Sequence, residues 1–316
     1  MKFNKILLIG IDKASLGDTY WRRIDNLSSS KVFVARDALV IKKELTEADC
    51  LLVNFGVPVT KDDIDKASNL KYIGTLSTAF GKVDTEYARK KNIPVCNLAG
   101  YSTESVAEFT IAAILEAIRG LETGKQRGRA GKYDESGIRA WEIKNKVFGI
   151  LGLGSIGTRV AELAQGFGAD VRYWSKHRKP NTEKKGVKYQ DDNTLIPQCD
   201  FLSINFAQTK ETEKFLNTEI ISDLKKGAVV VNTAPMELVD VNSLVKRLAK
   251  NDITFIFDHS DETDPKDLKQ LSKHKNCIIY PPMAYITDEA RVIKQEMFVS
   301  NIENYLKGKP SNIVNN

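Results

Sequence analysis

The sequence has no segment long enough to span a membrane as a helix and no cysteine pair at metal or redox spacing. Its N-terminal apolar run, Ile6-Leu7-Leu8-Ile9, is too short for the core of a secretion signal. The four cysteines lie far apart, without a C-x-x-C pair, at Cys50, Cys96, Cys199 and Cys277. We therefore expect buried free thiols, no metal site, no membrane partner and a reducing, cytoplasmic location.

A strong excess of one charge is also missing. The 47 basic residues exceed the 41 acidic ones by six, and no arginine-rich tract with interleaved aromatics occurs. This balance gives no reason to expect a nucleic-acid partner. The apolar share of 42% is ordinary for a globular protein, and 316 residues suffice for two domains. Internal repeats and low-complexity segments are absent.

Short, β-rich apolar runs alternate with helical patterns along the whole chain, which predicts an α/β fold with two doubly wound parallel sheets. The first series of runs comprises 6–9, 32–34, 51–54, 72–76 and 93–97. The second series comprises 147–151, 171–174, 201–205, 228–232, 253–257 and 277–280. Six strands of this kind match a dinucleotide-binding sheet.

Two long helices flank the second series. An amphipathic helix is predicted from about Ser102 to Leu121, and the polar stretch from Gly124 to Gly137 is predicted to be a surface excursion. The last helix, from about Thr287 to Lys307, follows the second series but should pack on the first domain. The chain would then cross between its domains twice.

A glycine motif follows the run that ends at Leu151. Gly152 permits a tight turn, Gly154 lets a pyrophosphate approach the backbone, and Gly157 lets helix and strand pack closely. Ser155 and Ile156 begin the next helix, whose N-terminus attracts phosphate. The motif therefore predicts a dinucleotide site rather than an unliganded glycine-rich turn.

The end of the next strand bears on the choice of cofactor. Sites for NAD usually carry an acidic residue there, whereas this chain has Ser175 followed by Lys176 and Arg178. Both cations can bind a 2′-phosphate through charge-assisted hydrogen bonds. NADP is the preferred prediction, and NAD remains possible because a basic loop can also simply be solvated.

Several segments together resemble the D-isomer-specific 2-hydroxyacid dehydrogenase family over nearly the full chain, and most of all its hydroxypyruvate and glyoxylate reductase branch. The matching segments are Val83-Asp84, 93–97, Tyr101-Ser102-Thr103-Glu104-Ser105-Val106-Ala107-Glu108, the glycine motif, Val231-Asn232-Thr233-Ala234, Val239-Asp240 and the closing 301–310. The resemblance implies a Rossmann dinucleotide-binding domain, residues 102–283, inserted into a split flavodoxin-like substrate domain, residues 1–101 and 284–316. It also implies a homodimer, a small-molecule substrate that is possibly anionic, and a nicotinamide cofactor contacted by Thr233, Ala234 and Asp258.

The resemblance fails at two catalytic positions. The family's substrate-anchoring arginine would fall at Pro235, and its acid histidine would fall at Pro282. Neither proline can donate a side-chain proton. The family's glutamate, which holds that histidine, has Asp264 or Glu262 as its nearest counterpart. The familiar residues for reducing a 2-oxo acid are therefore expected to be missing.

Other residues can be considered as replacements. His259 directly follows Asp258 and is a candidate displaced acid, although a solvent-exposed or turn-capping histidine is the alternative. Tyr101 and Tyr285 can present a phenol, and Lys82 can bind an anion, but packing and surface roles are the alternatives. Three functions stay open: an NADPH-dependent reductase with an atypical site, a catalytically silent cofactor-binding relative, and a small-anion binder using backbone amides near 77–80.

Overall fold

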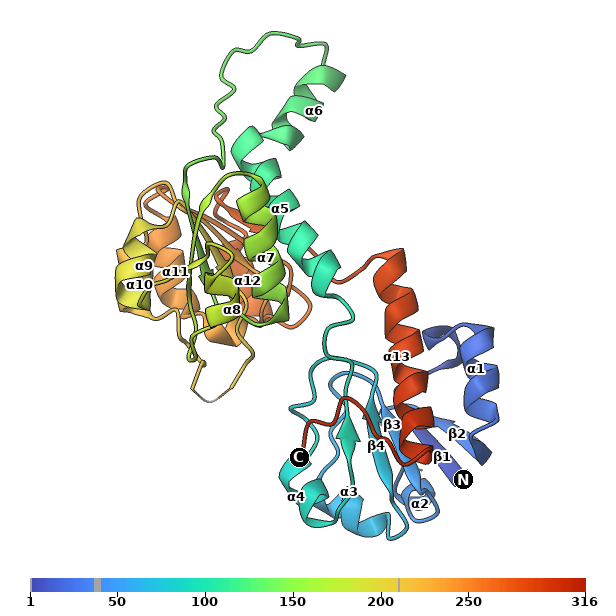
Figure 1. Cartoon of the computed structure of the whole chain (residues 1–316). Helices are drawn as coiled ribbons and strands as arrows, with labels where there is room; N and C mark the ends of the chain where they lie inside the picture. Colours follow the sequence, from blue (N-terminus) through green and yellow to red (C-terminus); the bar gives the residue numbers. More distant parts are fainter. Residues whose placement is uncertain (1, 37–40, 210) are drawn as a thin grey trace. The chain divides into compact units, whose positions relative to one another are not determined.

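The computed structural model describes residues 2–36, 41–209 and 211–316, which form two compact units. Unit 1 combines Met1–Ser102 with Thr287–Asn316, and unit 2 spans Thr103–Ile286. The chain thus leaves unit 1 once and returns to it, so unit 2 is an insertion. The sequence analysis placed the limits of this insertion at residues 102 and 283. Both units have the α/β architecture that the sequence predicts (Figure 1).

Unit 1 is built on a five-stranded parallel sheet in the order β2-β1-β3-β4-β5. This is the flavodoxin-like strand order, as predicted. Strands β3 and β4 are buried along their whole length, because helices cover both faces of such a sheet. The strands are β1 Phe3–Ile9, β2 Ser28–Val34, β3 Cys50–Val53, β4 Tyr72–Thr75 and β5 Val95–Cys96.

The last helix of the chain, α13, packs within unit 1 against α1 and β4, which confirms that prediction (Figure 1). Arg23 of α1 binds Glu296 and Glu303 of α13 at 2.7 and 2.8 Å and holds the two helices together. The helices are α1 Asp18–Asp25, α2 Ile41–Leu45, α3 Lys61–Lys66, α4 Thr85–Lys90 and α13 Asp288–Leu306, with a 3₁₀ turn η1 at Lys13–Ser15.

Unit 2 contains a seven-stranded parallel sheet in the order β8-β7-β6-β9-β10-β11-β12. The order reverses between β6 and β9, which is the arrangement of a dinucleotide-binding sheet. The strands are β6 Val147–Leu151, β7 Asp170–Trp174, β8 Lys188–Tyr189, β9 Phe201–Ile204, β10 Val229–Asn232, β11 Thr254–Phe257 and β12 Cys277–Ile279. The prediction of six strands missed β8, a two-residue edge strand.

The helices of unit 2 include one that the sequence analysis did not predict. Helix α6 occupies the first half of the predicted surface excursion, so that stretch is only partly irregular. In Figure 1, α6 and the loop after it stand away from the seven-stranded sheet. The helices are α5 Thr103–Arg119, α6 Leu121–Arg129, α7 Ser155–Gly166, α8 Pro180–Glu183, α9 Asp192–Leu195, α10 Thr218–Asp223, α11 Val241–Leu248 and α12 Pro265–Leu271, with 3₁₀ turns η2 at Ile196–Gln198 and η3 at Met236–Leu238.

All four cysteines are free and buried, as predicted. Burial raises the pKa of Cys96 to about 11 and the pKa of Cys199 and Cys277 to about 12. Within the described ranges, none of the helices combines the length and the apolar character needed to cross a bilayer.

Candidate functional site

The glycine motif joins β6 to α7 at the point where the strand order of unit 2 reverses. Gly152 has φ +89°, a left-handed conformation that favours glycine. A Cβ atom there would also lie 2.9 Å from the carbonyl oxygen of Asn205. The turn therefore brings the ends of β6 and β9 into contact, and a side chain at position 152 would prevent this contact.

The other two glycines differ in their surroundings. A Cβ atom on Gly157 would lie 2.1 Å from the carbonyl oxygen of Gly152, so this glycine is required for close packing of α7 on the turn. A Cβ atom on Gly154 would meet no described atom within 4 Å. Packing thus accounts for Gly157, while the space beside Gly154 is open to a ligand.

Helix α7 offers an anion site at its start. Ser155 and Ile156 are its first residues, and the preceding Gly154 makes no side-chain capping hydrogen bond. The first turn has no acidic residue. The N–H groups and the positive end of the helix dipole therefore remain suited to a pyrophosphate.

The end of β7 carries the predicted basic residues. Ser175 follows Trp174 directly, and the ammonium of Lys176 lies 2.7 Å from Glu211. The guanidinium of Arg178 binds Glu183 at 2.5 Å and lies 5.1 Å from the centre of the Tyr189 ring. Both cations therefore already have carboxylate partners, which a 2′-phosphate would have to share or displace.

Asp258 follows β11 directly and is almost completely buried. Its Oδ2 atom accepts a 2.9 Å hydrogen bond from the backbone N–H of Ala284, whereas its Oδ1 atom is buried without a hydrogen-bond donor among the described residues. Burial raises the pKa of Asp258, and the bond from Ala284 opposes this rise. An acceptor left unpaired in this way is suited to a ligand N–H group.

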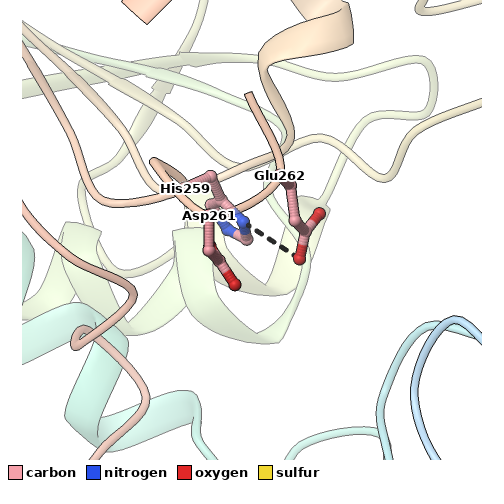
Figure 2. A group of neighbouring side chains, drawn as sticks. All are labelled: His259, Asp261 and Glu262. Atoms are coloured by element: carbon pink, nitrogen blue, oxygen red, sulfur yellow. Dashed lines mark ion pairs between the residues drawn. The ribbon is translucent and has the colours of Figure 1, made fainter. Parts of the chain in front are cut away.

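His259 lies between a carbonyl and two carboxylates. Its Nε2 atom is 3.1 Å from the Thr233 oxygen and must carry a proton there, because a carbonyl only accepts. Its Nδ1 atom is 3.7 Å from Glu262 (Figure 2). Burial lowers the pKa of His259, but Glu262 and Asp258 outweigh burial, so the pKa lies above its usual value.

Asp261 is the third member of this group in Figure 2. One ligand atom each from His259, Asp261 and Glu262 lies within 4.8 Å of the others. Asp261 and Glu262 belong to the exposed turn that follows β11. This proximity alone assigns no ion, and the expectation of no metal site stays a prediction.

The remaining sequence candidates of unit 2 have clear structural positions. Asp264 is the N-cap of α12 and accepts a hydrogen bond from the backbone N–H of Lys266 at 2.8 Å, so Glu262, rather than Asp264, is the carboxylate beside His259. Thr233 and Ala234 follow β10, and Pro235 comes next, immediately before η3. Pro282 lies in the segment between β12 and Ala284.

Asn205 is a residue to which the sequence analysis assigned no role. It directly follows β9 and lies beside Gly152, and its Oδ1 atom is buried without a described hydrogen-bond donor. Its Nδ2 atom donates to the Ser203 hydroxyl at 3.0 Å. A polar residue at the end of a buried strand is the signal that could have identified it.

Unit 1 has candidate residues of its own. Tyr101 is half-buried, and the ammonium of Lys294 lies 5.7 Å from the centre of its ring. The loop after β4 is held by its carbonyl groups: Ser77 O accepts from Leu98, and Thr78 O accepts from Asn97.

Comparisons with known proteins agree with this geometry. Residues 111–284 match the family model described as D-isomer specific 2-hydroxyacid dehydrogenase, NAD binding domain. A putative 2-hydroxyacid dehydrogenase of Staphylococcus epidermidis is 34% identical, covering 88% of this chain and 90% of the relative. A hydroxypyruvate reductase of Blautia hydrogenotrophica is 29% identical (95% and 96% covered), and a glyoxylate reductase of Thermococcus litoralis is 31% identical (87% and 86% covered).

Solved structures show the same architecture. The D-lactate dehydrogenase of Aquifex aeolicus, complexed with NAD and lactic acid, matches with a TM-score of 0.87 at 26% identity, covering 98% of this chain and 99% of that one. An acyclic imino acid reductase, complexed with NADPH and D-Arg, matches with a TM-score of 0.85 at 26% identity and the same coverage. The chain therefore belongs to the D-isomer-specific 2-hydroxyacid dehydrogenase family.

Proposed function

We propose that this protein is an NADPH-linked oxidoreductase that reduces a small carbonyl compound. The observation that carries the proposal is the glycine turn, which leaves open space at Gly154, together with the unpaired buried Oδ1 atom of Asp258. When bound, the cofactor supplies the hydride. The turn and the start of α7 would bind its pyrophosphate, and Asp258 would accept the N–H of its carboxamide.

The charges at the end of β7 favour NADPH over NADH. Ser175 leaves no carboxylate at the end of β7 to repel a 2′-phosphate. Lys176 and Arg178 are exposed, and Glu211, the partner of Lys176, is exposed as well. A doubly charged phosphate can compete for such solvent-exposed cations, because exposed ion pairs contribute little free energy.

We propose that His259 donates the proton that the carbonyl oxygen takes up during reduction. The resemblance places prolines at the family's arginine and histidine positions, so a proton donor must come from elsewhere. His259 holds one proton at Nε2 against Thr233, and Glu262 near Nδ1 favours binding of the second. The Nδ1 proton is the one proposed to leave, because Nδ1 has no hydrogen-bond partner among the described residues and the ring then returns to its neutral form. Its pKa is raised above the usual value for histidine, which favours the acid form.

An imine is a second candidate substrate. A protonated C=N group already carries its proton, so its reduction depends less on a positioned acid than the reduction of a carbonyl does. The structural similarity to a reductase named for acyclic imino acids supports this alternative. The two relatives named for hydroxypyruvate and glyoxylate support the carbonyl substrate.

The test is NADPH oxidation with glyoxylate, hydroxypyruvate and pyruvate, each with and without ammonia. His259→Asn should lower kcat by about 10²- to 10⁴-fold while leaving the Kd for NADPH within threefold. His274→Asn, which changes a histidine in the turn after α12, is the matched control and should behave as wild type. Unchanged turnover in His259→Asn would remove that residue from the mechanism.

We also propose that the protein is a homodimer. The segment from α6 to Trp141 exposes large apolar side chains: Leu121 48%, Tyr133 87%, Ile138 45% and Trp141 46%. Exposed apolar residues concentrated on one projecting segment are typical of an interface. Light scattering should give twice the 35.3 kDa chain mass, and a Tyr133→Ser/Trp141→Ser double variant should shift it toward the monomer.

A further inference from the structure

A buried tyrosine holds the segment that follows Arg178. Tyr173 of β7 is fully buried, and its hydroxyl donates to the Oε1 atom of Glu183 at 2.7 Å. The same hydroxyl accepts a hydrogen bond from the backbone N–H of Lys179 at 2.7 Å. The phenol therefore fixes both ends of the segment 179–183, which contains the four-residue helix α8.

Glu183, the last residue of α8, holds Arg178 along one edge of its guanidinium. The Oε1 and Oε2 atoms of Glu183 accept hydrogen bonds from Nε and Nη2 of Arg178 at 3.1 and 2.5 Å. The side chain of Glu183 is only 21% exposed, whereas that of Arg178 is 63% exposed. Hydrogen bonds from Arg178 and Tyr173 lower the pKa of Glu183, so its carboxylate is charged at neutral pH. Arg178 therefore faces a negative charge that is fixed in place.

The other edge of the Arg178 guanidinium is unused. Its Nη1 atom donates to no acceptor in the described part of the chain. The Tyr189 ring, whose centre lies 5.1 Å from the guanidinium carbon, packs against one face of the group. A guanidinium has five N–H donors, so the Nη1 edge can still bind a phosphate through two parallel hydrogen bonds. This edge is the one available to the 2′-phosphate of NADP.

The second cation of this loop is paired differently. Lys176 binds Glu211 at 2.7 Å, and the two side chains are 69% and 74% exposed. Among the described residues, Lys176 is the one hydrogen-bond donor to the Glu211 carboxylate. Glu211 can therefore turn away from an incoming phosphate, whereas Glu183 cannot do so without breaking its bond to Tyr173.

We propose that Glu183 is a specificity-determining residue that opposes the binding of a 2′-phosphate to Arg178. This inference rests on the proposed function, in which Arg178 binds that phosphate. A phosphate on the free edge would share the guanidinium with a second anion, and like charges held by one cation repel each other. NADH has no 2′-phosphate and meets no such repulsion. Glu183 therefore weakens the preference for NADPH and keeps NADH usable as well.

The test measures the ratio of the Kd for NADH to the Kd for NADPH, by titrating the full-length protein with each cofactor and following protein fluorescence. Glu183→Gln removes the charge and keeps an oxygen that can accept from the Tyr173 hydroxyl. The substitution should raise this ratio by about 3- to 10-fold, because NADPH binds more tightly while the Kd for NADH changes less than about twofold. The effect is a repulsion between charges near the surface, so it should shrink below about twofold in about 0.5 M KCl.

Glu162→Gln is the matched control, because Glu162 of α7 also pairs with an arginine, Arg159, at 3.2 Å. Both variants should melt within about 4 °C of wild type, and the control should leave the ratio within about twofold of it. An unchanged or lower ratio in Glu183→Gln, or a rise that does not depend on salt, would overturn the inference and leave the proposed function intact. The expected rise without NADPH oxidation by any substrate would instead contradict the proposed function alone.

Discussion

Two glycines of the nucleotide turn should respond in opposite ways to the same substitution. Gly154 and Gly157 are three residues apart, and alanine adds one methyl group to each. At Gly154 that methyl meets no described atom within 4 Å, whereas at Gly157 it would lie 2.1 Å from the Gly152 oxygen. The first substitution should therefore impair ligand binding, and the second should impair the fold.

The magnitudes follow from these surroundings. Ordinary contact of a Cβ atom begins near 3.4 Å, so Gly157→Ala must push α7 away from the turn by roughly an ångström. Overpacking of this kind costs about 1–3 kcal/mol, equivalent to about 2–12 °C in melting temperature for a domain of this size. Gly154→Ala changes a helix N-cap and should cost about 0.5–1 kcal/mol. Its methyl group would occupy space predicted for the pyrophosphate and weaken NADPH binding by about 10- to 100-fold.

The assay combines differential scanning calorimetry with NADPH titration followed by protein fluorescence. Gly154→Ala should melt within about 4 °C of wild type and bind NADPH weakly. Gly157→Ala should melt lower, by the amount expected from overpacking. If Gly154→Ala binds NADPH as tightly as wild type, the turn does not hold the pyrophosphate. If Gly157→Ala has the melting temperature of wild type, α7 is not packed against the turn as closely as the structure indicates.

Three further predictions concern single side chains. Arg178→Ala should weaken NADPH binding at least about 10-fold more than NADH binding, with Lys185→Ala as an exposed control, and equal losses for both cofactors would refute the 2′-phosphate assignment. The pKa of His259 is raised above its usual value of 6.5, so kcat/KM for reduction should be constant at low pH and fall tenfold per pH unit once the pH exceeds that raised pKa. A fall in kcat/KM that begins well below pH 6.5 would contradict the role of His259. Ellman's reagent should leave the native protein unmodified and should react in denaturant with the four thiols of Cys50, Cys96, Cys199 and Cys277. Rapid reaction of the native protein would show that these thiols are not buried.

The parallel sheets were predictable because buried strands read as uninterrupted apolar runs. Cys50–Val53 and Phe201–Ile204 are buried at every position, so pattern alone identifies them. Strand β8 has only Lys188 and Tyr189, an exposed and a half-buried residue at the sheet edge, and leaves no such pattern. Helix α6 contains Gly124 and no buried residue, so neither propensity nor periodicity predicts it.

The nucleotide turn was predictable because the spacing of its three glycines in the sequence is that of a dinucleotide-binding turn. The surroundings of His259 were not. Glu262 and Asp264 are equally plausible partners in sequence, and only the capping bond from Lys266 to Asp264 separates them.

We propose that this chain transfers hydride from NADPH without the arginine and histidine expected from its family. The measurement follows deuterium by mass spectrometry from NADPH labelled at both C4 hydrogens into the product, with glyoxylate, hydroxypyruvate, pyruvate and their imines as substrates. Our account predicts a deuterated product formed at about 1 s⁻¹ or faster with at least one of these substrates. Tight NADPH binding with no deuterium in any product would contradict it and would favour a protein that binds the cofactor without turning it over.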